Sequence, residues 1–65
     1  GTITVKRADY RGHKIKTAEG ILAAKISNTG NWTPLVPGAY TVEMNGRVVP
    51  FVVGEGEDIL FDAGE

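Results

Sequence analysis

The sequence predicts an all-β fold, a small sandwich or flattened barrel of five to seven short, mainly antiparallel strands. Residues 35–53, LVPGAYTVEMNGRVVPFVV, alternate between apolar and polar side chains on both sides of an Asn-Gly pair, as the strands of a β-hairpin do. Residues 2–7 alternate in the same way. Nine glycines and three prolines punctuate the 65-residue chain, which favours short strands joined by turns.

The length of the chain predicts a single domain, residues 1–65. A chain this short buries only roughly 60% of the surface that it exposes when unfolded. It contains no cysteine, so neither disulfides nor thiolate-bound metals can stabilise it. Its stability must come from packing or from self-association. Because no apolar run approaches the length of a membrane helix, we expect no membrane insertion.

The N-terminal part reads as strand, turn and strand. In residues 2–7, Ile3 and Val5 share one face and the threonines and Lys6 share the other. Residues 9–12, Asp-Tyr-Arg-Gly, form a turn signal, because Asp can accept from its own backbone and Gly tolerates positive φ. Residues 14–16 then make a short polar strand.

Residues 17–27 are open to two interpretations. An N-capped helix of two turns could begin at Thr17, with alanines and Leu22 favouring it. Gly20 in its first turn and the β-branched Ile21 and Ile26 favour a strand, which we expect here. Beyond a loop at residues 28–31, Pro34 and Pro37 frame an extended segment.

The hairpin carries the most specific prediction. A type I′ turn at Asn45-Gly46 would place Tyr40 opposite Phe51 and Thr41 opposite Pro50. One face then forms the core and consists of Tyr40, Val42, Met44, Val49, Phe51 and Val53. The reverse face is half apolar, and Val48 and Val52 on it suit a subunit contact. Pro50 lacks an N–H, so the outer side of its strand is an edge or is interrupted there.

Charge is distributed unevenly along the chain. Residues 1–25 hold six basic and two acidic residues, a balance of +4, and residues 26–65 hold one basic and six acidic residues, a balance of −5. The two halves can lie side by side and neutralise each other, which we favour. Alternatively, the basic half offers a surface to an acidic partner.

The order of these signals resembles a known group of modules. Residues 7–12 (Arg-Ala-Asp-Tyr-Arg-Gly) and residues 35–42 (Leu-Val-Pro-Gly-Ala-Tyr-Thr-Val) are similar to the opening and to the L-x-P-G-x-Y-x-V segment of Cna-B or prealbumin-like modules and of the carboxypeptidase-regulatory-like group. The resemblance implies a β-sandwich. Small sandwiches of this style also occur in phage receptor-binding and baseplate proteins.

The chemistry of the Cna-B modules, an internal Lys–Asn isopeptide bond promoted by a buried acid, does not carry over. Arg7 stands where these modules have the lysine, and Met44 stands where they have the acid. No asparagine follows position 45, and Asp62 is the nearest substitute for the acceptor. The resemblance therefore implies the fold without the cross-link.

The sequence predicts neither catalysis nor a cofactor. Ser27 and His13 are the only serine and histidine, and we interpret His13 as a solvated loop residue. Residues 54–58 offer three carboxylates but lack the spacing and ligand number of a calcium loop, so we expect a polar turn and no metal.

Two functions remain open. We expect a non-catalytic structural, assembly or adhesion module that contacts copies of itself or other subunits, in a phage particle or surface appendage, and we favour the extracellular surface or a virion over the cytoplasm. The alternative is a small barrel that binds nucleic acid through the basic segment at residues 6–16. The pI of 5.7 weighs against this alternative.

We expect Trp32 to be buried in the core. The candidate interaction residues are Lys6, Arg7, Tyr10, Arg11, Lys14, Lys16, Val48 and Val52.

Overall fold

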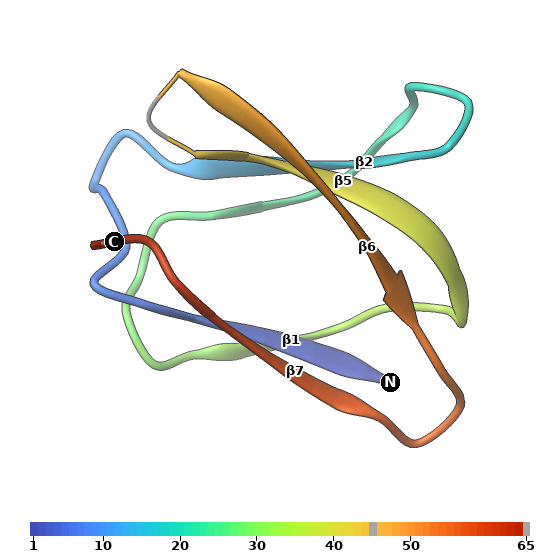
Figure 1. Cartoon of the computed structure of the whole chain (residues 1–65). Helices are drawn as coiled ribbons and strands as arrows, with labels where there is room; N and C mark the ends of the chain where they lie inside the picture. The colour runs from blue at the N-terminus through green and yellow to red at the C-terminus, as the bar shows by residue number, and fades with distance from the viewer. Residues whose placement is uncertain (45, 65) are drawn as a thin grey trace.

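A computed structural model describes residues 1–44 and 46–64. It contains seven strands in two sheets that face each other, which confirms the all-β sandwich (Figure 1). Among the described residues, no helix is long and apolar enough to cross a membrane. In chain order the strands are β1 (Thr2–Lys6), β2 (His13–Thr17), β3 (Leu22–Ile26), β4 (Trp32–Pro34), β5 (Gly38–Met44), β6 (Arg47–Val53) and β7 (Asp58–Asp62).

The first sheet has the order β4-β1-β7 and joins the two ends of the chain. β1 pairs in parallel with β7, so that Thr2 lies beside Asp58 and Lys6 beside Asp62. On its other side β1 pairs antiparallel with β4. This is the parallel exception in a mainly antiparallel fold. It places the basic N-terminal strand against the acidic C-terminal strand.

The second sheet has the order β3-β2-β5-β6 and contains the predicted hairpin. The predicted register is confirmed, since Tyr40 lies opposite Phe51 and Thr41 opposite Pro50. β6 is an edge strand, as the missing N–H of Pro50 requires. Of the predicted type I′ turn, Asn45 lies outside the described residues, whereas Gly46 has a φ of +81°.

Residues 17–27 form a turn and a strand, so the strand interpretation is correct. The backbone N–H of Gly20 donates to the carbonyl of Thr17 at 2.9 Å, and Gly20 takes a φ of +86°. The N–H of Thr17 donates to the carbonyl of Ile21 at 2.8 Å, which closes the β2–β3 hairpin. The positive φ of Gly20 is incompatible with a right-handed helix, and the turn therefore ends any helical tendency.

The core lies between the two sheets and consists of the inward face of nearly every strand. Rings from both sheets meet in it: Phe51 stacks on Tyr40 with 5.7 Å between centroids and meets the edge of Phe61 at 5.1 Å. Phe61 lies on β7, so this contact ties the first sheet to the second. The buried apolar residues are Ile3, Val5, Ile15, Ile26, Leu35, Tyr40, Val42, Met44, Val53 and Ala63.

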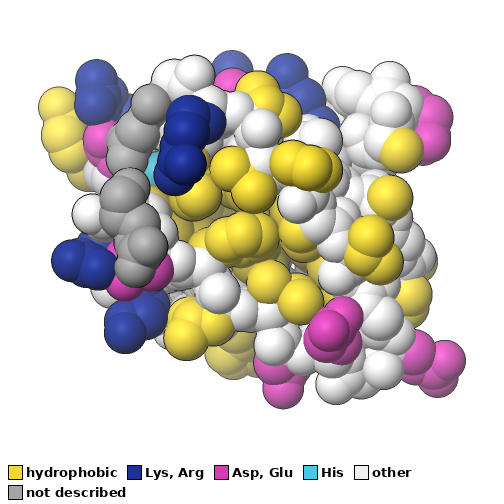
Figure 2. All heavy atoms as spheres, in the orientation of Figure 1, with side chains coloured by type: hydrophobic (Ala, Val, Ile, Leu, Met, Phe, Trp, Pro, Cys, Tyr) yellow, Lys and Arg dark blue, Asp and Glu magenta, His cyan; other side chains and the backbone are white. Residues whose placement is uncertain are grey.

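The sandwich is open on the side between β6 and β7. The two strands belong to different sheets and do not pair, so the fold is a sandwich and not a closed barrel. Figure 2 shows hydrophobic side chains reaching the surface on this side. The half-buried apolar residues of β6 and β7 are Val49, Phe51, Ile59 and Phe61.

Candidate interaction surfaces

Three of the five Lys and Arg residues in the basic segment at residues 6–16 form ion pairs. The Arg7 guanidinium pairs with Asp62, with Nε donating to Oδ1 at 2.8 Å. Arg11 pairs with Asp9 at 2.9 Å, and Lys16 Nζ pairs with Glu43 at 3.0 Å. Two of these three acids come from the acidic half of the chain. The predicted neutralisation between the two halves is therefore confirmed for part of the charge.

These ion pairs hold two carboxyl groups in the ionised form. Hydrogen bonds from the side chain and backbone of Arg11 lower the pKa of the Asp9 carboxyl from 3.8 to about 2. The Arg7 guanidinium, followed by the backbone N–H of Gly64, lowers the pKa of the Asp62 carboxyl. Both carboxylates thus remain available to their arginines at neutral pH.

The other basic residues do not converge on one surface. Lys6 alternates with the buried Val5 on β1, so it points out of the first sheet. Lys14 and Lys16 flank the buried Ile15 on β2, so they point out of the second sheet. Tyr10 is 86% exposed in the loop at one end. The structure therefore splits the segment between two opposite faces and a loop.

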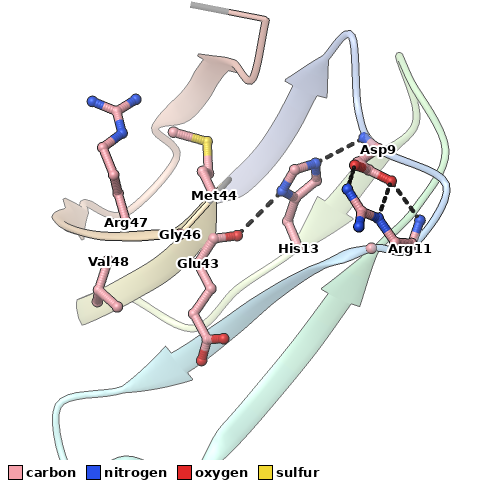
Figure 3. Close-up of a pocket in the computed structure, with 9 residues that line it drawn as sticks. Asp9, Arg11, His13, Glu43, Met44, Gly46, Arg47 and Val48 are labelled. Atoms are coloured by element: carbon pink, nitrogen blue, oxygen red, sulfur yellow. Dashed lines mark hydrogen bonds and ion pairs between the residues drawn. The ribbon is translucent and has the colours of Figure 1, made fainter.

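His13 is buried, which corrects the prediction of a solvated loop histidine. Its ring is 1% exposed, and both nitrogens have backbone partners (Figure 3). The N–H of Asp9 donates to Nε2 at 2.9 Å, and Nδ1 lies 3.2 Å from the carbonyl of Glu43 and donates to it. The ring therefore fastens the loop at residues 9–12 to β5. Alternation already places His13 on the inward face with Ile15, which the sequence interpretation overlooked.

The surface beside His13 forms a depression of about 400 Å³. Arg11 lies on one side, paired with Asp9, and Arg47 lies on the other with its guanidinium directed away from His13 (Figure 3). Because the cations do not converge and both nitrogens of His13 are already bonded, the depression offers neither a free base nor a cluster of cations. Among residues 1–44 and 46–64, no group of three or more His, Cys, Asp or Glu residues could hold a metal ion.

The outer face of β6 exposes the predicted apolar residues. Val48 is 63% exposed and Val52 is 67% exposed, and the exposed ring of Pro50 lies between them. The opposite side of the strand faces the core. These three side chains form an apolar stripe along one edge of the second sheet, which we call the β6 stripe.

The outer face of the first sheet holds a second exposed apolar group, which the sequence interpretation missed. Trp32 is 67% exposed, and its predicted burial in the core is wrong. Its neighbour Thr33 lies opposite the buried Ile3 and is directed inward, so alternation turns Trp32 outward. Leu60 is 62% exposed, and its position between the half-buried Ile59 and Phe61 is a period-two signal that could have been recognised.

The turn between β6 and β7 is polar, as predicted, and two of its acidic residues form hydrogen bonds within the chain. The carboxylate of Glu57 accepts from the N–H of Gly54 at 2.8 Å, and its backbone carbonyl accepts from the N–H of Thr2 at 2.9 Å. The hydroxyl of Thr2 donates to the carboxylate of Asp58 at 2.6 Å. The turn is thereby fixed to the beginning of β1.

Compared with protein-family models, curated proteins and solved structures, the chain shows no significant match.

Proposed function

We propose that this chain is a non-catalytic assembly module that contacts other protein subunits, copies of itself first among them, through the β6 stripe. The observation that carries the proposal is the exposure of Val48, Pro50 and Val52 in one line along β6. Exposed apolar side chains that form a continuous patch favour a contact, whereas scattered ones need no explanation.

The arrangement of charge supports association between copies. Figure 2 shows most basic side chains over the left and upper parts of the view and a group of acidic side chains at the lower right, near the β6–β7 turn, with other acidic side chains at the left and the upper right. Within the described residues, the cations without an ion pair are Lys6, Lys14, Lys25 and Arg47. Separated charge of this kind favours a contact in which the basic part of one copy approaches the acidic part of another.

Nucleic-acid binding has less support. Three of the six cations in residues 1–25 are engaged in ion pairs, and the others do not form one stripe. Nucleic-acid domains concentrate cations on one face, because affinity comes largely from neutralised phosphates.

The Cna-B-like resemblance fits the assembly proposal and a place in a surface appendage or phage particle outside the cytoplasm.

Sedimentation velocity tests the proposal. We expect a discrete oligomer at low salt that weakens as salt rises, because exposed charges are screened beyond about 10 Å at 0.1 M. The double variant Val48→Thr/Val52→Thr keeps the side-chain volume and removes apolar surface. It should weaken association about tenfold or more, since burying a valine contributes on the order of 1.5 kcal/mol.

Val36→Thr is the matched control, since Val36 is 77% exposed but lies in the loop before β5. It should leave association unchanged. A strict monomer at high protein concentration in low salt would refute the assembly proposal. A monomer that gains mass with a single-stranded oligonucleotide would instead support the nucleic-acid alternative.

A further inference from the structure

Trp32 lies in a row of side chains that crosses the outer face of the first sheet. Thr4 on the central strand β1 pairs with Trp32 on β4 and with Leu60 on β7. Residues paired in this way share a face, so the three side chains point outward together. This face is formed by the strands at the bottom of Figure 1, β1 and β7, with β4 beside β1.

Polar groups lie next to the indole in a surface depression. Its volume is about 480 Å³, within the roughly 300–1,000 Å³ of small-molecule sites. Thr2, Thr4, Trp32 and Asp58 line it. Thr2 donates its hydroxyl hydrogen to one oxygen of Asp58, which fixes both side chains. The hydroxyl oxygens and the carboxylate remain able to accept hydrogen bonds from a ligand.

The residues that line this depression favour a neutral sugar over a phosphate-bearing ligand. An exposed indole offers an apolar ring face together with one N–H donor. Of the described residues that line the depression, Asp58 alone is ionisable, and its negative charge opposes a phosphate group. A nucleotide could stack on the indole, but among the described residues no cation lines the depression, and Lys6 on the same face lies beyond Thr4. A neutral sugar ring has apolar C–H faces and a rim of hydroxyl groups, so it matches both parts of the lining.

We propose that the Trp32 face binds a neutral, extended polysaccharide of the β-1,4-linked glucan type. A flat, ribbon-like glycan can lie across the sheet with one ring against Trp32, while its hydroxyls donate to Asp58 and to the threonines. The site lies on the first sheet, whereas the β6 stripe lies on the second. Glycan binding is therefore independent of self-association.

The single tryptophan of the chain allows a direct test. Cellohexaose should shift the Trp32 emission to shorter wavelength, and calorimetry on the whole chain should give the affinity. Trp32→Ala should weaken binding about tenfold or more, since ring contacts of this kind contribute about a factor of ten. Trp32→Tyr should restore most of the affinity. Tyr10→Ala is the matched control, because it removes an exposed ring that does not line the depression, and it should leave the affinity for cellohexaose unchanged.

Asp58→Asn separates a neutral ligand from a cationic one. The amide oxygen can still accept from Thr2, so a neutral glycan should keep its affinity within a few-fold. Loss of all binding in this variant, together with binding of choline by the parent chain, would assign the face to cations and overturn the proposal.

Three further results would overturn it. The first is unchanged cellohexaose binding by a folded Trp32→Ala variant. The second is that the parent chain does not bind cellohexaose at millimolar concentration. The third is that the parent chain binds a hexanucleotide in place of the glycan. A shift of Trp32 emission with protein concentration alone would assign the face to a second copy and overturn it as well. Loss of self-association in Val48→Thr/Val52→Thr with intact glycan binding would show that the two sites are separate.

Discussion

Replacing His13 by alanine should destabilise this small fold more than any surface substitution. The ring is 1% exposed and fastens the loop at residues 9–12 to β5 through the N–H of Asp9 and the carbonyl of Glu43. Alanine removes both hydrogen bonds and leaves a cavity. The two backbone groups that lose a partner lie beside the open depression, so water can reach them and their loss falls at the low end of the usual range.

The expected magnitude follows from these terms. Two hydrogen bonds at about 1 kcal/mol each and the lost burial of the ring at about 1–2 kcal/mol give a decrease of about 3–4 kcal/mol in the free energy of unfolding. A domain of this length has a total stability of roughly 3–10 kcal/mol. His13→Ala should therefore remove between about a third and all of the stability of the fold.

Urea unfolding followed by circular dichroism measures the effect. Circular dichroism is preferred to fluorescence because Trp32 is already exposed in the folded chain. His13→Phe keeps an apolar ring and should cost only about 2 kcal/mol, the share of the hydrogen bonds. Lys14→Ala, at the exposed neighbouring position, should change stability by less than about 0.5 kcal/mol. If His13→Ala unfolded at the same urea concentration as the parent chain, the ring would not be the fastening that the structure shows.

Three other predictions concern the turn, the loop and the isopeptide cross-link of Cna-B modules. Gly46→Val should lower the free energy of unfolding by about 1–3 kcal/mol, because Gly46 has a φ of +81° and an added Cβ meets no atom within 4 Å, which leaves backbone strain as the cause. Gly46→Asn should lower it less, and equal urea midpoints for the two variants would contradict this prediction. The pKa of Asp9 is lowered, so the contribution of its carboxylate to stability is present above pH 4 and disappears as the pH falls towards 2. In urea titrations, Asp9→Asn should therefore be less stable than the parent chain at pH 7 and equally stable near pH 2. Intact mass spectrometry should give the full mass of the chain, because Arg7 replaces the lysine of the cross-link and no asparagine follows position 45. A mass short by one water would refute this.

The sequence by itself determined the elements whose residues interact locally. The register of the β5–β6 hairpin follows from a short turn and strict alternation, because cross-strand partners are fixed once the turn is placed. The edge position of β6 follows from the missing N–H of Pro50. The exposure of Val48 and Val52, two of the three residues of the β6 stripe, follows from the same alternation and could be predicted.

Only the tertiary structure decided which distant strands lie side by side. The parallel pairing of β1 with β7 brings Arg7 to Asp62 and places Leu60 in one row with Trp32, and no local pattern encodes that pairing. The three residues of β4 are too short a segment for alternation to show which side faces the core, so Trp32 was misplaced. His13 was misjudged for a related reason. The ring is bonded to the N–H of Asp9, four residues away, and to the carbonyl of Glu43, thirty residues away. These two groups come together only when β2 packs beside β5, and their hydrogen bonds allow a polar ring to be buried.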